Sequence, residues 1–201
     1  MWLSKMIKWN NKVVPVATIS NKEEANNFLS CLQESGLKVV EITYRTSYAS
    51  EAIKYANEKY PEVLVGAGTI INAKQCKSAI KSGAKFIVGP GFSKKVAKVC
   101  KRLNVLYIPG VVTPSEVMQA VNCGIEIVKF FPYSTFGSLD TVNALAGPFP
   151  NVKFMVTNGI TAENFLDILK NPHVICVGGS WMLKGTREEI LTKMKTAAEA
   201  L

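Results

Sequence analysis

Short apolar segments recur along the chain at intervals of about twenty to twenty-five residues, and more polar stretches separate them. This interval is typical of βα units, in which a buried strand is followed by a helix that returns the chain to the next strand. The pattern predicts eight strands: Val13–Ile19, Val39–Tyr44, Val63–Ile70, Phe86–Pro90, Leu106–Gly110, Ile127–Phe131, Phe154–Thr157 and Ile175–Gly178.

Residues that start and stop helices support the same division of the chain. Four of the predicted helices begin after a side chain that can accept a hydrogen bond from the helix N-terminus: Asn72, Ser93, Thr113 and Thr161. Three glycines lie between a predicted helix and the next strand, where a left-handed backbone is often needed: Gly36, Gly83 and Gly124.

Eight strands that alternate with helices predict a parallel sheet. Closure into a single (β/α)8 TIM barrel over residues 1–201 is favoured over an open doubly wound sheet, although periodicity alone does not separate the two. The open fold suggests a glycine-rich turn after the first strand, and this chain has Ser20-Asn21-Lys22-Glu23 there. Trp2, Met6 and Trp9 at helical spacing predict an extra helix over residues 1–11 that packs on the barrel.

Composition and charge limit the class of protein. With 48% hydrophobic residues in 201, the chain is long and apolar enough to fold around one core. The net charge of +9 raises the question of a nucleic-acid partner, but the excess is scattered lysine and the chain has only three arginines. No apolar run is long enough to cross a bilayer, and residues 1–12 show no secretory signal. We expect a cytoplasmic protein with neither nucleic acid nor membrane as a partner.

Cysteine and histidine usage argues against metal and thiol chemistry. The five cysteines contain no CxxC pair, which predicts reduced, buried thiols. The chain has one histidine, His173, which precedes the eighth strand and is expected at the end of the barrel opposite the site. We therefore predict no metal site.

Polar side chains interrupt the second predicted strand on one face. Alternation places Glu41, Thr43 and Arg45 together, and in a barrel this polar set faces the interior near the carboxyl ends of the strands. Burial of a carboxylate and a guanidinium is costly unless they act on something or pair with each other. A structural Glu41–Arg45 ion pair is about as consistent with this pattern as a functional site.

Lys129 lies at the centre of the apolar sixth strand, on the same face as Ile127 and Phe131. Loss of water around an ammonium favours the neutral amine, which is the form that attacks a carbonyl. The alternatives are a side chain that reaches to solvent or an ion pair with Glu41. A lysine at this place favours a functional role.

Three glycine-containing strand ends are candidates for ligand contacts. Gly66-Ala67-Gly68-Thr69 ends the third strand and offers a hydroxyl for a small anion. Thr157-Asn158-Gly159-Ile160 and Gly178-Gly179-Ser180 follow the seventh and eighth strands, where barrels often bind phosphate.

Seven motifs occur in an order that resembles one enzyme family: Glu41-x-Thr43-x-Arg45-Thr46, Gly66-Ala67-Gly68-Thr69, Gly89-Pro90-Gly91, Ile108-Pro109-Gly110, Lys129-Phe130-Phe131-Pro132, Ala146-Gly147-Pro148-Phe149 and Gly178-Gly179-Ser180-Trp181. From about Val13 to Leu183 the chain resembles the 2-keto-3-deoxy-6-phosphogluconate (KDPG) aldolases, a family that also includes 4-hydroxy-2-oxoglutarate (KHG) aldolase activity. The resemblance implies an aldehyde-lyase of Entner–Doudoroff carbohydrate metabolism, usually a homotrimer, without metal or organic cofactor.

The resemblance also implies residue roles. Lys129 forms a Schiff base with the C2 ketone of a 2-oxo acid, and Glu41 acts as general base and acid through water. Arg45 and Thr69 hold the substrate carboxylate, and Pro90 and Phe131 pack near the pyruvyl carbons. The phosphate end of the substrate is bound at the ends of the seventh and eighth strands, by Thr157, Asn158, Gly159, Gly178, Gly179 and Ser180.

Asn158 departs from the Thr-Gly-Gly-Ile sequence that the family commonly has at the seventh strand. Asparagine tolerates a positive φ, so we expect the turn to survive. Its side chain predicts weaker phosphate selectivity, or a preference shifted to KHG or a C4 epimer. A Schiff-base aldolase with the same mechanism that acts on a non-phosphorylated 2-oxo acid is the second enzyme alternative. A non-catalytic sugar-phosphate-binding barrel or assembly scaffold is the alternative of another class, and a nucleic-acid module is a distant third.

Overall fold

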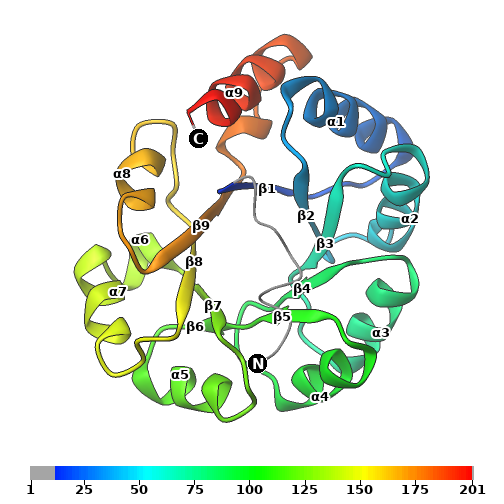
Figure 1. The fold of residues 1–201 in the computed structure, drawn as a ribbon. Coiled ribbons are helices and arrows are strands. Elements are labelled where there is room, and N and C mark those ends of the chain that lie inside the picture. Colours follow the sequence, from blue (N-terminus) through cyan, green and yellow to red (C-terminus); the bar gives the residue numbers. More distant parts are fainter. Residues whose placement is uncertain (1–11, 201) are drawn as a thin grey trace.

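The structure is a computed structural model that describes residues 12–200, so the predicted N-terminal helix over residues 1–11 lies outside the described residues. Parallel strands form a ring with helices outside it (Figure 1), which confirms the predicted barrel. The strands are β1 (Val13–Ala17), β2 (Val39–Thr43), β3 (Leu64–Gly68), β4 (Phe86–Val88), β5 (Leu106–Ile108), β6 (Gly110–Val111), β7 (Ile127–Phe130), β8 (Lys153–Thr157) and β9 (Val174–Gly179).

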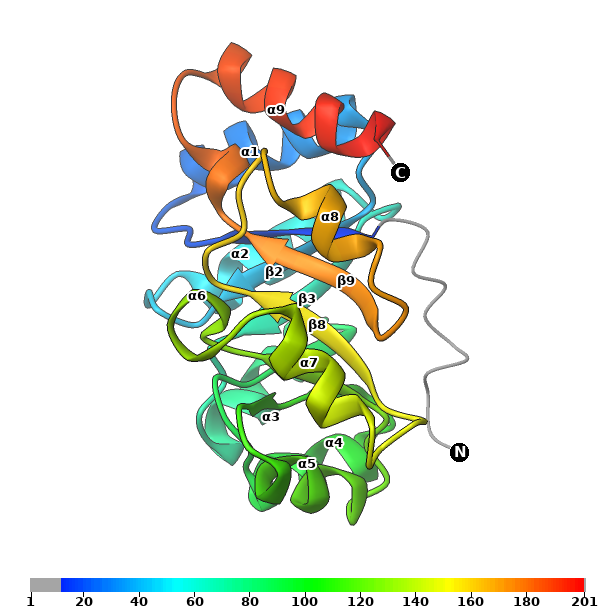
Figure 2. The same ribbon diagram turned by 90° about the vertical axis from the view of Figure 1, so that its left-hand side faces the viewer.

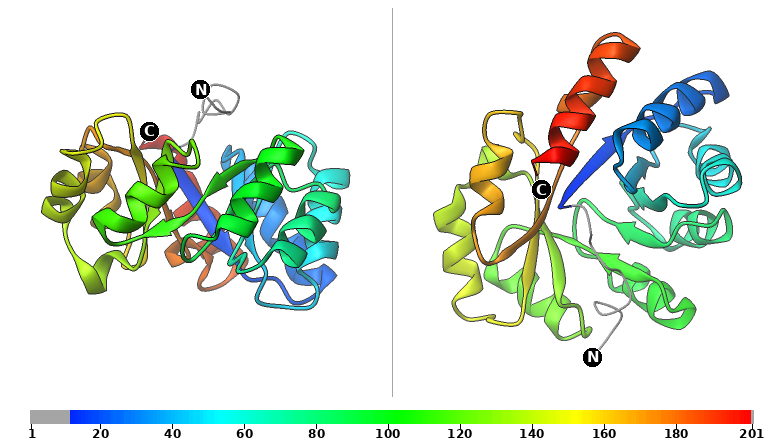
Figure 3. Two further views of the ribbon diagram at one scale, coloured as in Figure 1. Left: turned by 90° about the horizontal axis from the view of Figure 1, so that it is seen from below. Right: turned by 45° about the horizontal axis from the view of Figure 1, so that its top comes forward.

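Helices follow the strands in turn, as the alternating pattern predicts. They are α1 (Lys22–Ser35), α2 (Ala49–Lys59), α3 (Ala73–Lys81), α4 (Lys94–Leu103), α5 (Pro114–Val121), α6 (Tyr133–Phe136), α7 (Leu139–Ala146), α8 (Phe165–Leu169), the 3-10 turn η1 (Trp181–Leu183) and α9 (Arg187–Glu199). The first and last of these, α1 and α9, lie side by side and complete the outer layer (Figure 3). Within residues 12–200, no helix is long and apolar enough to cross a membrane.

The predicted fifth strand is divided in two, because Pro109 has no N–H to donate to a neighbouring strand. β5 pairs with β4, whereas β6 pairs with β7, so the strand order runs β5-β4-β3-β2-β1-β9-β8-β7-β6. The Pro109 carbonyl still accepts a hydrogen bond from the Lys129 N–H at 2.7 Å. One segment therefore bridges both edges of the sheet, and the barrel is nearly closed.

The apolar residues form two layers. The inner cluster contains strand residues alone and fills the barrel: Val14, Val39, Phe86, Val88, Leu106, Ile108, Ile127, Met155 and Cys176. The larger cluster lies between the strands and the surrounding helices. Glu41 and Lys129 come two residues after Val39 and Ile127 on the same strands, so they share the inward face and lie nearer the carboxyl end.

Three of the four predicted helix starts are confirmed, because the side chains of Asn72, Ser93 and Thr113 accept backbone hydrogen bonds at the N-termini of α3, α4 and α5. The fourth is wrong by three residues. Thr161 N–H donates to Asn164 Oδ1 at 2.9 Å, and this turn delays the start of α8 until Phe165. The predicted left-handed glycines are confirmed, with φ of +81° at Gly36, +104° at Gly83 and +78° at Gly124.

Candidate active site

A cavity of about 580 Å³ lies at the carboxyl ends of the strands, where barrel enzymes have their active sites. In Figure 2 the arrows of β8 and β9 point to this end, where α6 also lies. Its volume suits a small organic ligand. Nine of the twelve predicted site residues line it: Arg45, Lys129, Phe131, Thr157, Asn158, Gly159, Gly178, Gly179 and Ser180.

Lys129 reaches the cavity from the middle of β7, and its side chain is only 10% exposed. Its Nζ lies 3.7 Å from Glu41 Oε1 and 5.2 Å from the centroid of the Phe131 ring. A separation of 3.7 Å is an ion pair without a hydrogen bond. The ammonium is therefore held by one charge and one aromatic face, and its nitrogen lies beside a cavity large enough for a substrate.

Glu41 is buried behind Lys129, with 1% of its side chain exposed. Neither carboxylate oxygen has a hydrogen-bond partner among the described residues. A buried carboxylate with unfilled hydrogen-bonding capacity is costly to fold, and such groups in native proteins call for an explanation such as a catalytic role. Gly68 makes the necessary room, because a Cβ at that position would overlap Glu41 Oε1.

Arg45 does not pair with Glu41, so the structural Glu41–Arg45 ion pair considered from the sequence is not formed. Instead the Arg45 Nε–H donates to Thr69 Oγ1 at 3.2 Å. Thr69 has a φ of +56°, which is strained for a β-branched residue and is typical of functional sites. The guanidinium retains donors for a carboxylate at the edge of the cavity.

Glu41, Thr69 and Pro90 are the predicted site residues that do not line the cavity directly. Glu41 and Thr69 act on residues that do, through the contacts above. The backbone of Pro90 lies against Gly110, since a Cβ at Gly110 would overlap the Pro90 carbonyl. Gly110 is the register partner of Lys129, so Pro90 is close to the lysine strand, but its contact with a substrate stays a prediction.

The turn after β8 has two consecutive left-handed residues, Asn158 with φ of +76° and Gly159 with φ of +78°. The expectation that asparagine would accept this backbone is confirmed. Asn158 is anchored twice to α6, because Ser134 Oγ donates to its Oδ1 at 2.7 Å and the Ser134 N–H donates to its carbonyl at 3.3 Å. The Asn158 side chain is thus directed to α6 while the residue still lines the cavity.

The turn after β9 is shaped by close packing. A Cβ at Gly179 would overlap the Trp181 ring, and one at Gly178 would crowd Met155 and Thr157. Thr157, at the end of β8, lines the same cavity, and its buried Oγ1 has no hydrogen-bond partner among the described residues. The glycine residues of the two turns therefore line one part of the cavity, next to a buried hydroxyl whose hydrogen-bonding capacity is unfilled.

Sequence reasoning missed several lining residues, among them Thr18, Trp181 and Lys184. Thr18 was detectable, because it is a polar residue directly after β1, and its Oγ1 lies 2.9 Å from Thr43 Oγ1. Trp181 is the last residue of the Gly178-Gly179-Ser180-Trp181 motif, and its ring stacks on that of Phe165 with 5.8 Å between the ring centroids. Lys184 follows a turn and has no strand pattern that would reveal it.

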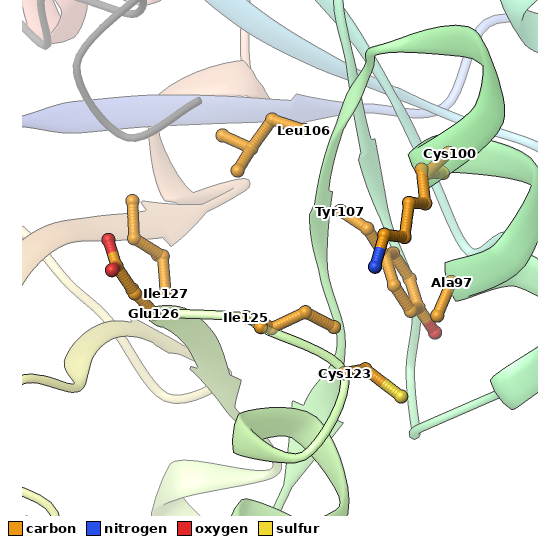
Figure 4. A pocket seen from close by; sticks show the side chains of 10 residues that line it. Ala97, Cys100, Leu106, Tyr107, Cys123, Ile125, Glu126 and Ile127 are labelled. Carbon is orange, nitrogen blue, oxygen red and sulfur yellow. The ribbon is translucent and has the colours of Figure 1, made fainter. Parts of the chain in front are cut away.

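A second cavity lies near the amino-terminal ends of β5 and β7, with Leu106, Tyr107, Cys123 and Ile127 among its walls (Figure 4). At about 20 Å³ it holds little more than a water molecule, which excludes it as a substrate site. His173 directly precedes β9, which confirms its place at the opposite end of the barrel from the active-site cavity. Within residues 12–200, no group of three or more His, Cys, Asp or Glu side chains is placed to hold a metal ion.

Cys176 lies on β9 in the inner apolar cluster, close enough to Glu41 and Lys129 for their charges to act on its thiol. Burial raises its pKa, the Glu41 carboxylate adds to the increase and the Lys129 charge opposes it. A thiol kept protonated is a poor nucleophile. The prediction that this buried cysteine is inert is therefore supported by its surroundings.

A parallel barrel with a polar cavity at the carboxyl ends of its strands has the architecture of TIM-barrel enzymes. The family model of KDPG and KHG aldolase matches residues 4–196. The KHG/KDPG aldolase of Escherichia coli strain K12 is 37% identical over 171 residues, which are 85% of this chain and 80% of that protein.

Solved structures give the same result. The KDPG aldolase of Zymomonas mobilis ATCC 29191 is 35% identical with a TM-score of 0.89, and the match covers 94% of this chain and 92% of that one. The KDPG aldolase of Legionella pneumophila, with pyruvate captured at low pH as a covalent carbinolamine intermediate, is 34% identical with a TM-score of 0.85 and coverage of 94% and 92%. The chain belongs to the KDPG and KHG aldolase family.

Proposed function

We propose that this protein is a Schiff-base (class I) aldolase, an aldehyde-lyase that cleaves KDPG to pyruvate and glyceraldehyde 3-phosphate. By the same chemistry it cleaves KHG to pyruvate and glyoxylate. The proposal rests on the family to which the chain belongs and on the site that its own residues form. The required groups are a nucleophilic amine, a base beside it and an anion clamp.

The observation that carries the proposal is the buried Lys129–Glu41 pair at the edge of the cavity. The Lys129 Nζ lies 3.7 Å from a carboxylate whose oxygens accept no hydrogen bond from the described residues. An ion pair with only a structural purpose would be expected to satisfy those oxygens, because the cost of burial is otherwise not offset. A role as a non-catalytic barrel or scaffold does not explain why the Lys129–Glu41 pair is buried at the cavity with unfilled hydrogen-bonding capacity.

In the first step, the neutral Lys129 amine attacks the C2 ketone and forms a carbinolamine. Loss of water then gives a protonated imine, with the proton supplied by solvent water in the cavity. The carbinolamine of pyruvate in the Legionella pneumophila enzyme is the same type of adduct and supports this step. Arg45, oriented by Thr69, holds the substrate carboxylate so that the ketone faces Lys129.

In the second step, the imine accepts the electron pair of the C3–C4 bond. Glu41, acting through a water molecule, removes the proton of the C4 hydroxyl, so the bond breaks to an aldehyde and an enamine. The enamine carbon then takes a proton from the same relay, and hydrolysis of the imine releases pyruvate and restores the amine. Phe131 and Pro90 pack beside the pyruvyl carbons, and the turns at Thr157–Ile160 and Gly178–Ser180 hold the phosphate.

Release of pyruvate from KDPG, followed with lactate dehydrogenase and NADH, tests the proposal. Lys129→Met removes the nucleophile and is expected to abolish release, whereas Lys98→Met on the exposed face of α4 is expected to keep wild-type kcat/KM. Pyruvate release by Lys129→Met at the wild-type rate would contradict the assignment of the nucleophile. No release by the wild type from KDPG or KHG would contradict the substrate class.

A second candidate function is supported by Asn158, which replaces the glycine common in the family. An aldolase with this residue would prefer KHG, a C4 epimer or a non-phosphorylated 2-oxo acid. Substrate profiling separates the candidates, because all of them share the Lys129 chemistry and differ only in the distal end of the substrate.

We also propose a cytoplasmic homotrimer that acts in Entner–Doudoroff carbohydrate metabolism, as the family resemblance implies. Ile71 and Phe136 are each 60% exposed, which gives apolar surface of the kind that subunit contacts bury. Light scattering on the purified protein tests the assembly. A mass three times that of one chain is expected, and a monomer would contradict the proposal.

A further inference from the structure

Three cationic residues line the active-site cavity: Arg45, Lys129 and Lys184. No aspartate or glutamate is among its described lining residues. The proposed function uses Lys129 as nucleophile and Arg45 for the substrate carboxylate. Lys184 has no part in that scheme, although it shares the cavity with both.

The backbone of Lys184 is held in place from both sides. On the preceding side, η1 starts directly after Ser180, and the Leu183 N–H donates to the Ser180 carbonyl at 3.1 Å. On the following side, Gly185 adopts φ of +113°, and the Lys193 ammonium donates to the Lys184 carbonyl at 2.7 Å. A fixed backbone four residues after Ser180 keeps the base of the Lys184 side chain next to the Gly178–Ser180 turn.

The Lys184 ammonium has no carboxylate partner among the described residues. The nearby Glu189 is engaged elsewhere, because its Oε2 accepts the Thr186 N–H at 2.7 Å in the N-terminal cap of α9. The charge of Lys184 is therefore available to a ligand in the cavity. Its side chain is exposed, so solvent screens its charge, and its contribution to ligand binding is expected to be moderate.

The sheet order separates this charge from the carboxylate clamp. Arg45 follows β2 and Lys184 follows β9, with β1 between those two strands. The cavity thus offers cations at two separate places on its rim, with uncharged turns beside Lys184. This arrangement complements a substrate with a carboxylate at one end and a second anion at the other.

We propose that Lys184 is a specificity-determining residue that contacts the phosphate of a phosphorylated 2-oxo acid through its ammonium. This inference rests on the proposed function and deepens it. A lysine binds phosphate as a point charge on a flexible stem, without the fixed fork of an arginine. Lys184 consequently favours phosphorylated over non-phosphorylated substrates and leaves the chemistry at Lys129 unchanged.

The test compares Lys184→Gln with Lys195→Gln, a matched loss of charge at an exposed residue of α9 outside the cavity. Kinetics are measured on KDPG and on 2-keto-3-deoxygluconate, which lacks the phosphate. Lys184→Gln is expected to lower kcat/KM on KDPG about five- to tenfold, mainly through KM, with less than a twofold change on the other substrate. Lys184→Arg is expected to recover most of the loss, and Lys195→Gln to behave as wild type.

Equal effects of Lys184→Gln and Lys195→Gln, or an equal loss on both substrates, would overturn the proposal. Binding of glycerol 3-phosphate, measured by calorimetry, gives a readout that does not require turnover. Weaker binding of glycerol 3-phosphate in Lys184→Gln, but not in Lys195→Gln, supports the inference even if the protein cleaves no 2-oxo acid. That result would contradict the proposed function and leave the role of Lys184 in phosphate binding standing. Unchanged binding together with unchanged kinetics on KDPG would remove the role of Lys184.

Discussion

Gly68→Ala tests whether the open space at this glycine exists to position Glu41. A methyl group at Gly68 would occupy the place of Glu41 Oε1 and would crowd Cδ and Cγ of the same side chain. These atoms are the end of a flexible side chain, so the carboxylate moves while the backbone stays. Gly66→Ala is the matched variant, because it lies two residues earlier on the same face of β3 and its methyl would meet the fully buried ring of Phe86.

The two variants are expected to separate activity from stability. Displacement of a catalytic group by about 1 Å costs about 100-fold in rate, which is about 2.7 kcal/mol of transition-state stabilisation. For Gly68→Ala we expect this loss in kcat, with a decrease of about 1 kcal/mol or less in the free energy of unfolding. For Gly66→Ala we expect about 1–3 kcal/mol of destabilisation from overpacking and a smaller loss of kcat.

Urea unfolding and steady-state pyruvate release from KDPG measure the two effects. Borohydride trapping with pyruvate adds a third readout, because imine formation depends on Lys129 and is expected to persist in Gly68→Ala. The reasoning is refuted if Gly68→Ala keeps kcat within about threefold of wild type while it loses more stability than Gly66→Ala.

Two further substitutions and one labelling experiment test other parts of the protein. Glu41→Gln removes the base and is expected to lower kcat by about 10²- to 10⁴-fold while pyruvate still traps on the enzyme; wild-type kcat would contradict its role. Asn158→Gly removes the acceptor of the 2.7 Å hydrogen bond from Ser134 Oγ and is expected to change the ratio of kcat/KM for KDPG to kcat/KM for KHG severalfold. An unchanged ratio would show that Asn158 does not determine substrate specificity. Iodoacetamide on the folded protein is expected to label the half-buried Cys123 and to spare Cys176, whose pKa burial raises; peptide mapping that finds Cys176 labelled first would refute this.

The strands could be predicted because each one corresponds to a short apolar segment of the sequence. A buried parallel strand needs a continuous apolar run, and polar residues are tolerated only where the run reaches the site. Glu41 and Lys129 were detectable for this reason. The division of the fifth strand at Pro109 was also encoded, since proline lacks the donor that a ladder requires, but the pattern of apolar residues alone did not show it.

Pairings between distant residues could not be predicted in the same way. Whether Glu41 lies against Arg45 or Lys129 depends on strand register and on the room that Gly68 leaves, and neither follows from the alternation of residues along one strand. The bond between Asn158 and Ser134 joins two loops and has no local signal. Lys184 reaches the cavity through the packing of a 3-10 turn, so its place depends on tertiary contacts.

The central claim is that Lys129 is the nucleophile, and trapping of its adduct tests it most directly. The protein is incubated with pyruvate, reduced with borohydride, digested, and mapped by mass spectrometry. The structure predicts a reduced pyruvyl adduct on the Lys129 peptide, absent when pyruvate is omitted and absent in Lys129→Met. An adduct on another lysine, or none under conditions in which the enzyme releases pyruvate from KDPG, would contradict it.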